Sequence, residues 1–124
     1  MLNTSPLSVM VASQAKVYGE RTALRYRDYN KSIWKDVSWN EFARRVRAVS
    51  NALLEMGVGE QENVAVYAQN MVENLFVDFG CYAIRAVGVP FYATSSEAQV
   101  KYMINDASIR LVFVGEQSQY DVAF

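Results

Sequence analysis

Histidine is absent from this 124-residue chain, and cysteine occurs once, at Cys81. Without histidine the chain lacks the commonest general base and the commonest metal ligand of proteins. A lone cysteine excludes a disulfide within the chain and fits a reducing, cytoplasmic setting. The sequence therefore offers no histidine-based catalysis, no histidine-ligated metal and no internal disulfide.

A long apolar run and an excess of charge are also missing. The most apolar stretch, residues 75–89, is interrupted by Asp78 and Arg85 and falls short of the ~20 residues that a membrane-spanning helix needs. Residues 1–18 lack the basic start and the apolar run of a signal peptide. The formal net charge of −1 gives no reason to expect a nucleic-acid partner. We expect a cytoplasmic protein, and peripheral contact with a membrane is left open.

The chain does have enough apolar sequence for a packed core, with 52% hydrophobic and 20% charged residues. At its start, Ser5 is predicted as the N-cap of a helix and Pro6 as the first helical residue. Residues 23–27 alternate apolar and charged side chains, and residues 33–37 read as the return strand of an antiparallel hairpin. Residues 1–37 are therefore predicted to form a helix plus a hairpin.

The clearest predicted helix begins after Ser38. Ser38 and Glu41 form a capping box, in which the serine hydroxyl accepts from the Glu41 N–H and the glutamate bonds back. Val37 and Phe42 are placed as a hydrophobic staple across this start, and Gly57 follows as the left-handed C-cap. The apolar stripe of this helix comprises Phe42, Val46, Val49, Leu53 and Met56.

Three short apolar runs, residues 63–68, 89–92 and 110–114, are predicted to be strands. Helical patterns separate them, so the order is strand, helix, strand, helix, strand. Parallel neighbours need crossover connections of this kind, which predicts a three-stranded parallel sheet. Residues 38–124 are thus predicted to be a parallel β-α-β-α-β unit, and the chain as a whole an α/β fold.

The ends of the crossover helices are also predicted. Residues 70–73 offer a cap pattern for the first helix, and Gly88 is expected to stop it. A capping box begins at Ser96 and opens the second. Pro90 is awkward in the second strand, because proline donates no ladder hydrogen bond and prefers an edge or a strand's first residue.

Ordered phrases along the chain resemble the adenylate-forming family of acyl-CoA synthetases, peptide-synthetase adenylation domains and luciferases. Residues 37–42 resemble an aromatic phrase that precedes a family helix, and residues 54–66 resemble its Gly-Val-x-x-Gly-Asp-x-Val-Ala stretch. Asn70 and Glu73 match an Asn-x-x-Glu pair of the family. Residues 89–96, Val-Pro-Phe-Tyr-Ala-Thr-Ser-Ser, resemble the Val-Pro-Leu-Tyr-Pro-Thr phrase of long-chain fatty acyl-CoA synthetases.

Two places depart from the family pattern. The family usually carries glycine where this chain has Arg85 and Ala86, and proline where Ala93 stands. Both changes affect loop geometry more than chemistry. They weaken the assignment to a subfamily rather than to the family.

The resemblance implies that residues 1–124 are an incomplete N-terminal part of a larger adenylate-forming domain, in a long-chain fatty acid–CoA ligase. For that parent enzyme it implies ATP, magnesium and coenzyme A, a fatty acid substrate, and the remainder of the ligase chain as partner. The family's catalytic, cofactor-binding and metal-binding residues are expected beyond these 124 positions, and no Gly-x-x-x-x-Gly-Lys-[Ser/Thr] loop occurs here. We therefore expect the 124 residues alone to be inactive.

A hydroxyl-rich turn, with Tyr92, Thr94, Ser95 and Ser96, stands between a predicted strand end and a predicted helix start. Ligands gather at this position in parallel sheets, and helix N-termini favour anions. Capping by Ser95 or Ser96 explains the same residue types. We interpret the turn as a cap.

Two further clusters have a structural interpretation. Arg44, Arg45 and Arg47 are interpreted as a solvated helix face, with Arg45 four residues after Glu41 and paired to it. Aromatic side chains gather around the hairpin and are interpreted as packing rather than as a surface for stacked bases. These aromatic residues are Tyr26, Tyr29, Trp34 and Trp39.

Three single residues complete the candidates. Cys81 has no nearby cation to activate a thiolate and is interpreted as buried packing. Asp78 and Arg85 lie on a mostly apolar helix and are interpreted as an ion pair, or as contacts with parts of the protein beyond this chain.

Two alternatives stay open. One is an adenylation or aryl-acid ligase of the same family, and the other is a stand-alone α/β interaction module. The module would need the helix at residues 71–86 to be covered within the chain. Because that helix is apolar on more than one face, we expect exposed apolar surface and self-association.

Overall fold

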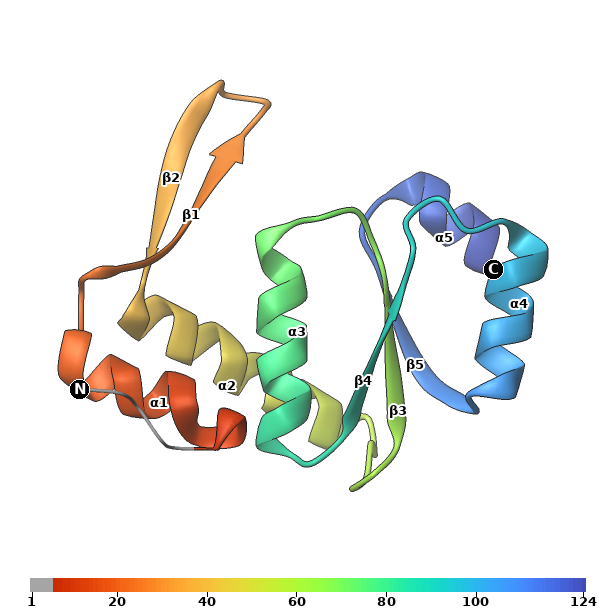
Figure 1. Cartoon of the computed structure of the whole chain (residues 1–124), viewed down its shortest axis with the longest axis horizontal. Coiled ribbons are helices and arrows are strands. Elements are labelled where there is room, and N and C mark those ends of the chain that lie inside the picture. The colour runs from red at the N-terminus through yellow and green to blue at the C-terminus, as the bar shows by residue number, and fades with distance from the viewer. Residues whose placement is uncertain (1–5) are drawn as a thin grey trace.

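The computed structural model describes residues 6–124 as an α/β fold (Figure 1). In chain order the elements are α1 (Leu7–Tyr18), β1 (Thr22–Asp28), β2 (Ile33–Ser38), α2 (Trp39–Glu55), β3 (Asn63–Tyr67), α3 (Val72–Ala83), β4 (Val87–Phe91), α4 (Glu97–Asp106), β5 (Ile109–Val114) and α5 (Gln117–Ala123). The predicted helix, hairpin and β-α-β-α-β unit are confirmed. Within the described residues, no helix combines the length and the hydropathy needed to cross a membrane.

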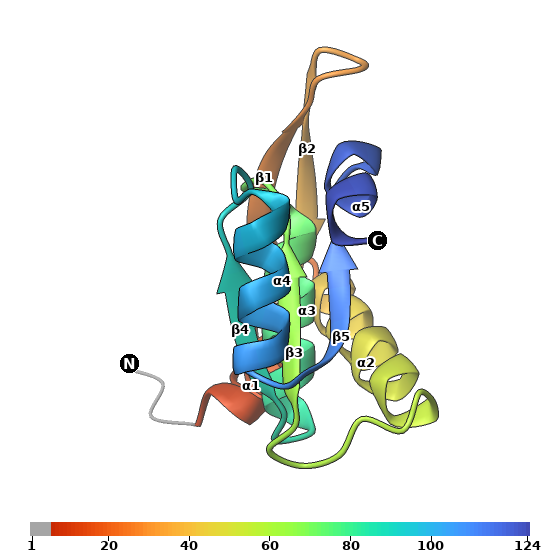
Figure 2. The ribbon, with the colours of Figure 1, turned by 90° about the vertical axis from the view of Figure 1, so that its right-hand side faces the viewer.

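β3 is the central strand of a parallel sheet with the order β4-β3-β5. Ala65 lies opposite Val89 of β4 and opposite Val112 of β5. From Val64 to Tyr67 the strand is buried at every residue, as expected for a strand covered on both faces. α2 and α3 supply one cover and α4 and α5 the other, so the sheet is the middle layer (Figure 1). Figure 2 looks onto the sheet from the side of α4 and α5.

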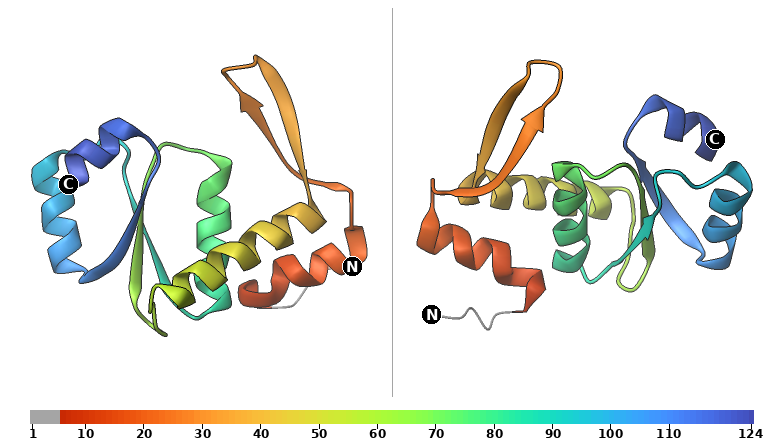
Figure 3. Two further views of the ribbon diagram at one scale, coloured as in Figure 1. Left: turned by 180° about the vertical axis from the view of Figure 1, so that it is seen from behind. Right: turned by 45° about the horizontal axis from the view of Figure 1, so that its top comes forward.

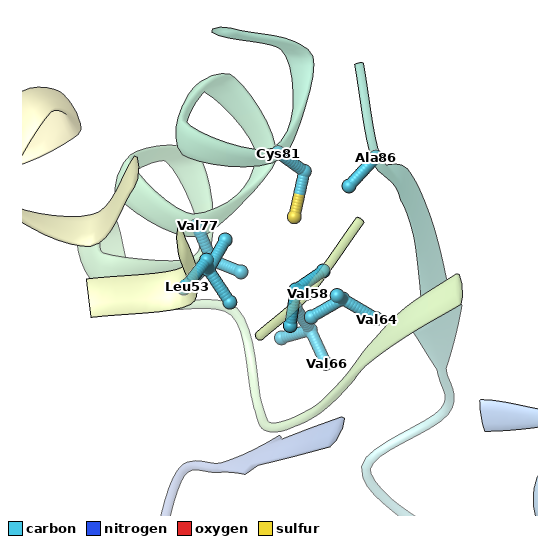
Figure 4. Packing of buried hydrophobic residues seen from close by; sticks show 7 residues of the cluster. All are labelled: Leu53, Val58, Val64, Val66, Val77, Cys81 and Ala86. Atoms are coloured by element: carbon cyan, nitrogen blue, oxygen red, sulfur yellow. The ribbon is translucent and has the colours of Figure 1, made fainter. Parts of the chain in front are cut away.

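Val64 and Val66 point from β3 toward α2 and α3 (Figure 4). They pack in one cluster with Leu53 of α2 and with Val77 and Cys81 of α3. Leu53, Val64 and Cys81 have no exposed surface. Burial of an aliphatic side chain of this size contributes about 1.5–3 kcal/mol. This cluster therefore fixes both helices on the sheet.

Tyr67 and Ala65 point to the opposite face, because successive side chains of a strand alternate. They pack with Phe91 of β4 and Val100 of α4, and the rings of Tyr67 and Phe91 have centroids 6.4 Å apart. Val122 of α5 lies against the same cluster. The second face is thus closed by α4 and α5.

A third cluster joins α1 and the β1–β2 hairpin to α2 and α3. It contains Val11 of α1 and Phe76 of α3, together with Val37 and Phe42, the pair predicted as a staple. The hairpin is antiparallel, as predicted. Its strands extend from this cluster away from the helices (Figure 3).

The two predicted capping boxes differ in outcome. In α4 both bonds form: Gln99 N donates to Ser96 Oγ at 3.4 Å, and Ser96 N donates to Gln99 Oε1 at 2.8 Å. In α2 only the Ser38 half forms, with Glu41 N donating to Ser38 Oγ at 3.1 Å. The Glu41 carboxylate accepts from two arginines of the next turn instead, because charge-assisted hydrogen bonds are stronger than neutral ones.

Several predicted boundaries are wrong. Pro6 takes the N-cap position of α1 rather than its first turn, and the predicted Ser5 cap lies outside the described residues. Met71, not Asn70, precedes α3, and no side chain caps that helix. Gly88 lies within β4 and does not stop α3.

The true end of α3 explains why β4 begins earlier than predicted. Arg85 adopts a left-handed backbone with φ 61°, a conformation that glycine adopts most easily. The Arg85 carbonyl then accepts from Gln61 N at 2.8 Å. Pro90 is accommodated because β4 is an edge strand.

α3 is covered on both of its apolar faces within this chain, so the expectation that it would be left exposed is wrong. Val77 faces the sheet, whereas Phe76 and Phe79 join the cluster of α1 and α2. Leu75 stays 37% exposed. Large exposed apolar side chains lie on α1 and the hairpin, and include Leu7, Val9, Val17, Tyr29, Ile33 and Trp34.

α2 packs directly against α3 at Gly80. A Cβ added there would lie 2.6 Å from Val49 Cγ1. Ser50 Oγ lies 3.1 Å from the Gly80 carbonyl and 2.9 Å from the Val46 carbonyl. The predicted stripe omitted Ser50, which is buried, and included Met56, which is exposed.

We expect Gly80→Ala to destabilise the chain by about 1–2 kcal/mol. Overpacking costs about 1–3 kcal/mol, and a 2.6 Å contact belongs at the upper end of that range. Alanine favours the helix by about 1 kcal/mol relative to glycine, which offsets part of this cost. Urea unfolding followed by circular dichroism measures the change.

Gly59→Ala is the matched control, because the nearest atom to its added Cβ lies 3.7 Å away. We expect a change within about 0.5 kcal/mol for this variant. Equal stability of the two variants would contradict the close contact at Gly80.

Candidate functional site

The carboxyl ends of β3, β4 and β5 lie at one edge of the sheet, where the connections to α3, α4 and α5 begin. In open parallel sheets, ligands bind where neighbouring strands send their helices to opposite faces. β3 meets this condition with both of its neighbours, since α3 packs on one face and α4 and α5 on the other. Between β3 and β5, a side-chain hydrogen bond also joins the two strand ends. The candidate site is therefore the edge between Gln69, after β3, and Glu116, after β5.

Polar contacts join these two strand ends. Gln69 Nε2 donates to Glu116 Oε1 at 2.7 Å, and Gly115 N donates to the Tyr67 carbonyl at 3.1 Å. Asn74 Nδ2 donates to the Gln69 carbonyl at 2.9 Å, which links α3 to the same edge. Gln69 Oε1 is buried and has no hydrogen-bond partner among residues 6–124. The edge thus contains an unused acceptor.

Gly115 makes this approach possible. A Cβ at Gly115 would lie 2.7 Å from Ala68 Cβ and 2.7 Å from Gln69 Oε1. Sequence reasoning missed this site, because Gln69 and Glu116 are 47 residues apart and neither side chain marks a motif.

The hydroxyl-rich turn after β4 has a structural role. Ser96 caps α4, as interpreted from the sequence. Tyr67, which is 2% exposed, donates its hydroxyl to the Ser95 carbonyl at 2.8 Å. Thr94 is exposed, and Tyr92 is 86% exposed. The turn is therefore held from below by a buried tyrosine.

An open groove of about 1040 Å³ lies between the β1–β2 hairpin and α3, and it reaches Gln69 and Glu116. Trp34 and Tyr29 line it from the hairpin side, and Asp78 from α3. The packing interpretation is confirmed for Tyr26 and Trp39, which belong to the cluster of α1 and α2. It is wrong for Tyr29 and Trp34, which are 83% and 63% exposed because the hairpin extends beyond that cluster.

The arginine cluster forms a solvated helix face, as predicted. Arg44 Nη2 lies 2.6 Å and Arg45 Nε 2.7 Å from Glu41 Oε1. Hydrogen bonds from Arg44 and then Arg45 lower the pKa of Glu41 to about 2. Arg47 is exposed.

The remaining candidate residues do not form a common site. Cys81 is fully buried, and burial, followed by the charge of Asp78, raises its pKa to about 11, so the thiol is inert packing as interpreted. Asp78 and Arg85 do not pair, because Arg85 Nη2 lies 2.8 Å from Glu60 Oε1. In the described part of the chain, no three Asp, Glu, Cys or His side chains come together to hold a metal ion.

The parallel sheet with helices on both faces places the chain in the class of open α/β folds. Within that class, the chain belongs to the family of AMP-binding enzymes, whose family model matches residues 11–123. The resemblance to adenylate-forming enzymes is thereby confirmed.

Curated relatives carry acyl-CoA ligase names. The chain is 33% identical over 86 residues to the long-chain-fatty-acid–CoA ligase FadD15 of Mycobacterium bovis, a match that covers 69% of this chain and 14% of that protein. It is 31% identical to the peroxisomal long chain acyl-CoA synthetase 7 of Arabidopsis thaliana, over 83% of this chain and 15% of that protein. The chain therefore spans about one-seventh of the length of these relatives.

Solved structures share the fold. A benzoate CoA ligase from Burkholderia xenovorans LB400 superposes with a TM-score of 0.81 and 18% identity, over 95% of this chain and 23% of that one. VinN superposes with a TM-score of 0.84 and 21% identity, over 95% of this chain and 30% of that one. At these identities the likeness concerns the fold alone.

Tyr67→Phe is expected to lower the free energy of unfolding by about 1 kcal/mol, because the Ser95 carbonyl loses its donor. Tyr92→Phe removes the same hydroxyl from an 86% exposed ring and should change stability by less than about 0.5 kcal/mol. Urea unfolding of the two variants measures the difference. The assigned role of Tyr67 fails if the two variants are equally stable.

Glu41 should make stability depend on pH in acid. Its folded pKa of about 2 lies below the ordinary value of 4.5, so its contribution is complete above pH 4.5 and is lost as pH falls toward 2. Glu41→Gln should therefore flatten the loss of stability over this window, measured by urea midpoints at successive pH values. Because the pair is exposed, 1 M salt should reduce the difference between wild type and variant; an undiminished difference would exclude the ion pairs as its cause.

Proposed function

We propose that residues 1–124 form the N-terminal scaffold of a longer ligase that joins a long-chain fatty acid to coenzyme A. The observation that carries this proposal is the 33% identity over 86 residues to a long-chain-fatty-acid–CoA ligase, within a match to the AMP-binding family over residues 11–123. The remainder of the ligase chain is then the partner of these residues.

The proposed reaction has two steps. The carboxylate of the acid attacks ATP, which forms an acyl-adenylate and releases pyrophosphate. The thiol of coenzyme A then attacks the acyl carbon and releases AMP, so that a thioester replaces the mixed anhydride. Magnesium would neutralise phosphate charge in the first step.

Residues 6–124 do not fit ATP, magnesium or coenzyme A as a binding site. They bring together no group of three potential metal ligands, and the sequence has no phosphate-binding glycine–lysine loop. Glu116, at the candidate edge, already accepts from Gln69. The proposed role of these residues is therefore to support the fold of the larger domain, and none of them is given a part in the reaction.

Two other functions remain as alternatives. VinN has been solved with 3-methylaspartate, and another neighbour is a benzoate ligase. Their identities of 18–21% show the fold only, whereas several curated relatives above 30% are named for long-chain acids. One observation favours a stand-alone module: α3 is covered within the chain.

The domain division at residue 38, the cytoplasmic location and self-association stay predictions, and peripheral contact with a membrane stays open.

ATP–pyrophosphate exchange tests the proposed function. A longer chain that contains these residues should exchange label with palmitate, and less with benzoate or aspartate. The 124-residue chain should be silent with all three acids, because the family's nucleotide-binding residues are expected beyond these positions and residues 6–124 bring together no metal-binding group. Exchange by the 124 residues alone would overturn the scaffold role, and preference for benzoate or aspartate would overturn the fatty acid.

A further inference from the structure

The groove between the hairpin and α3 has one wall with unused acceptors. Asp78, in the middle of α3, is half-buried, and residues 6–124 provide it with no ion pair and no hydrogen bond. Burial raises the pKa of Asp78, because a carboxylate is poorly solvated there. Gln69 Oε1, which is buried and receives no hydrogen bond from residues 6–124, lies at the end of the same wall.

The two arginines that line the groove, Arg25 and Arg27, make other contacts. Arg25 on the hairpin wall donates to Asp36 at 2.6 Å and 3.0 Å. The guanidinium of Arg27 lies 5.8 Å from the ring centre of Tyr29. Neither arginine is bonded to Asp78, so the α3 wall keeps its negative charge.

The hairpin wall is aromatic. Trp34 is 63% exposed and Tyr29 is 83% exposed, and both line the groove. An exposed tryptophan beside an acidic wall suits an occupant with an apolar surface and a positively charged donor. The occupant is thus defined by two complementary requirements.

From these contacts we propose that the groove is the docking site for a later segment of the same ligase chain, which supplies a lysine or arginine to Asp78 and an apolar surface to Trp34. This inference rests on the proposed function, since it needs the longer chain. The length relation supports it: the curated relatives are about seven times longer than this match, so most of such a chain lies outside these residues. The docked segment is expected to hold the hairpin against α3.

Asp78→Asn tests the proposal through the sign of its effect in two chains. In the 124-residue chain the variant should raise Tm by about 1–3 °C, because it removes an unpaired, half-buried carboxylate. In the longer ligase chain it should lower Tm by about 2–4 °C, because it leaves the docked cation without its partner. The same sign in both chains would overturn the proposal.

Asp106→Asn is the matched control, because Asp106 is exposed at the end of α4, away from the groove. It should shift Tm in the same direction in both chains. Opposite signs for Asp106→Asn would mean that chain length alone inverts such effects, and would remove the support from Asp78.

Trp34→Ala tests the docking proposal independently of Asp78. Its side chain is exposed, so the 124-residue chain should keep its Tm within about 1 °C, whereas the longer chain should lose several degrees. Hydrogen exchange should also show β1 and β2 better protected in the longer chain. Equal protection and an unchanged Tm in the longer chain would overturn the proposal, even if that chain performs palmitate-dependent exchange.

A second copy of the chain is the competing occupant. Sedimentation of the 124-residue chain over a range of concentrations distinguishes it. A monomer, or self-association that Trp34→Ala leaves unchanged, supports docking of a later segment, whereas a dimer that Trp34→Ala dissociates assigns the groove to a second copy. Lack of ligase activity in the longer chain would overturn the proposed function but leave these stability signs unchanged.

Discussion

Burial of β3 on both faces is the constraint on which the rest of the structure depends. Val64 and Val66 point to one side and Ala65 and Tyr67 to the other, so each side needs its own layer of helices. Parallel neighbours cannot be joined by short turns, and the crossovers place α3 and α4 where those layers are needed. Asn63 Nδ2, which donates to the Ala107 carbonyl at 2.6 Å, links the amino-terminal end of the strand to the end of α4.

The hairpin is positioned only indirectly by that sheet. α3 lies against β3 with one face and against α1 and α2 with the other, and Gly80 allows α2 to come close. The hairpin joins this outer cluster through Val37, near its base, while Trp34 extends beyond it. A groove beside α3 follows from this geometry, because Tyr29 and Trp34 of the hairpin stay exposed along it.

Tyr67 connects the core to the polar edge. Its ring is buried against Phe91, its hydroxyl holds the turn at Ser95, and its carbonyl accepts from Gly115 N. Stability of the sheet and order at the carboxyl edge are therefore coupled at one residue.

Local features were predictable from the sequence because their causes lie within a few residues. The Ser96 cap, the hairpin and the alternation of strands and helices all follow from short-range hydrogen bonding and side-chain periodicity. Even here, nearby residues changed one outcome: Arg44 and Arg45 donate to the Glu41 carboxylate, which therefore does not complete the predicted capping box. Family membership also came from ordered phrases, and the match over residues 11–123 confirms it.

The features that only the tertiary structure decided depend on contacts between segments that are far apart in the sequence. Pro90 is tolerated because strand order makes β4 an edge, and no local pattern encodes that order. Gln69 meets Glu116 across 47 residues, at a point where only glycine fits at position 115. Trp34 was expected to be packed and is exposed, because burial depends on which surfaces lie opposite. The sequence by itself determined the elements and the family, while the contacts between elements decided the polar edge and the groove.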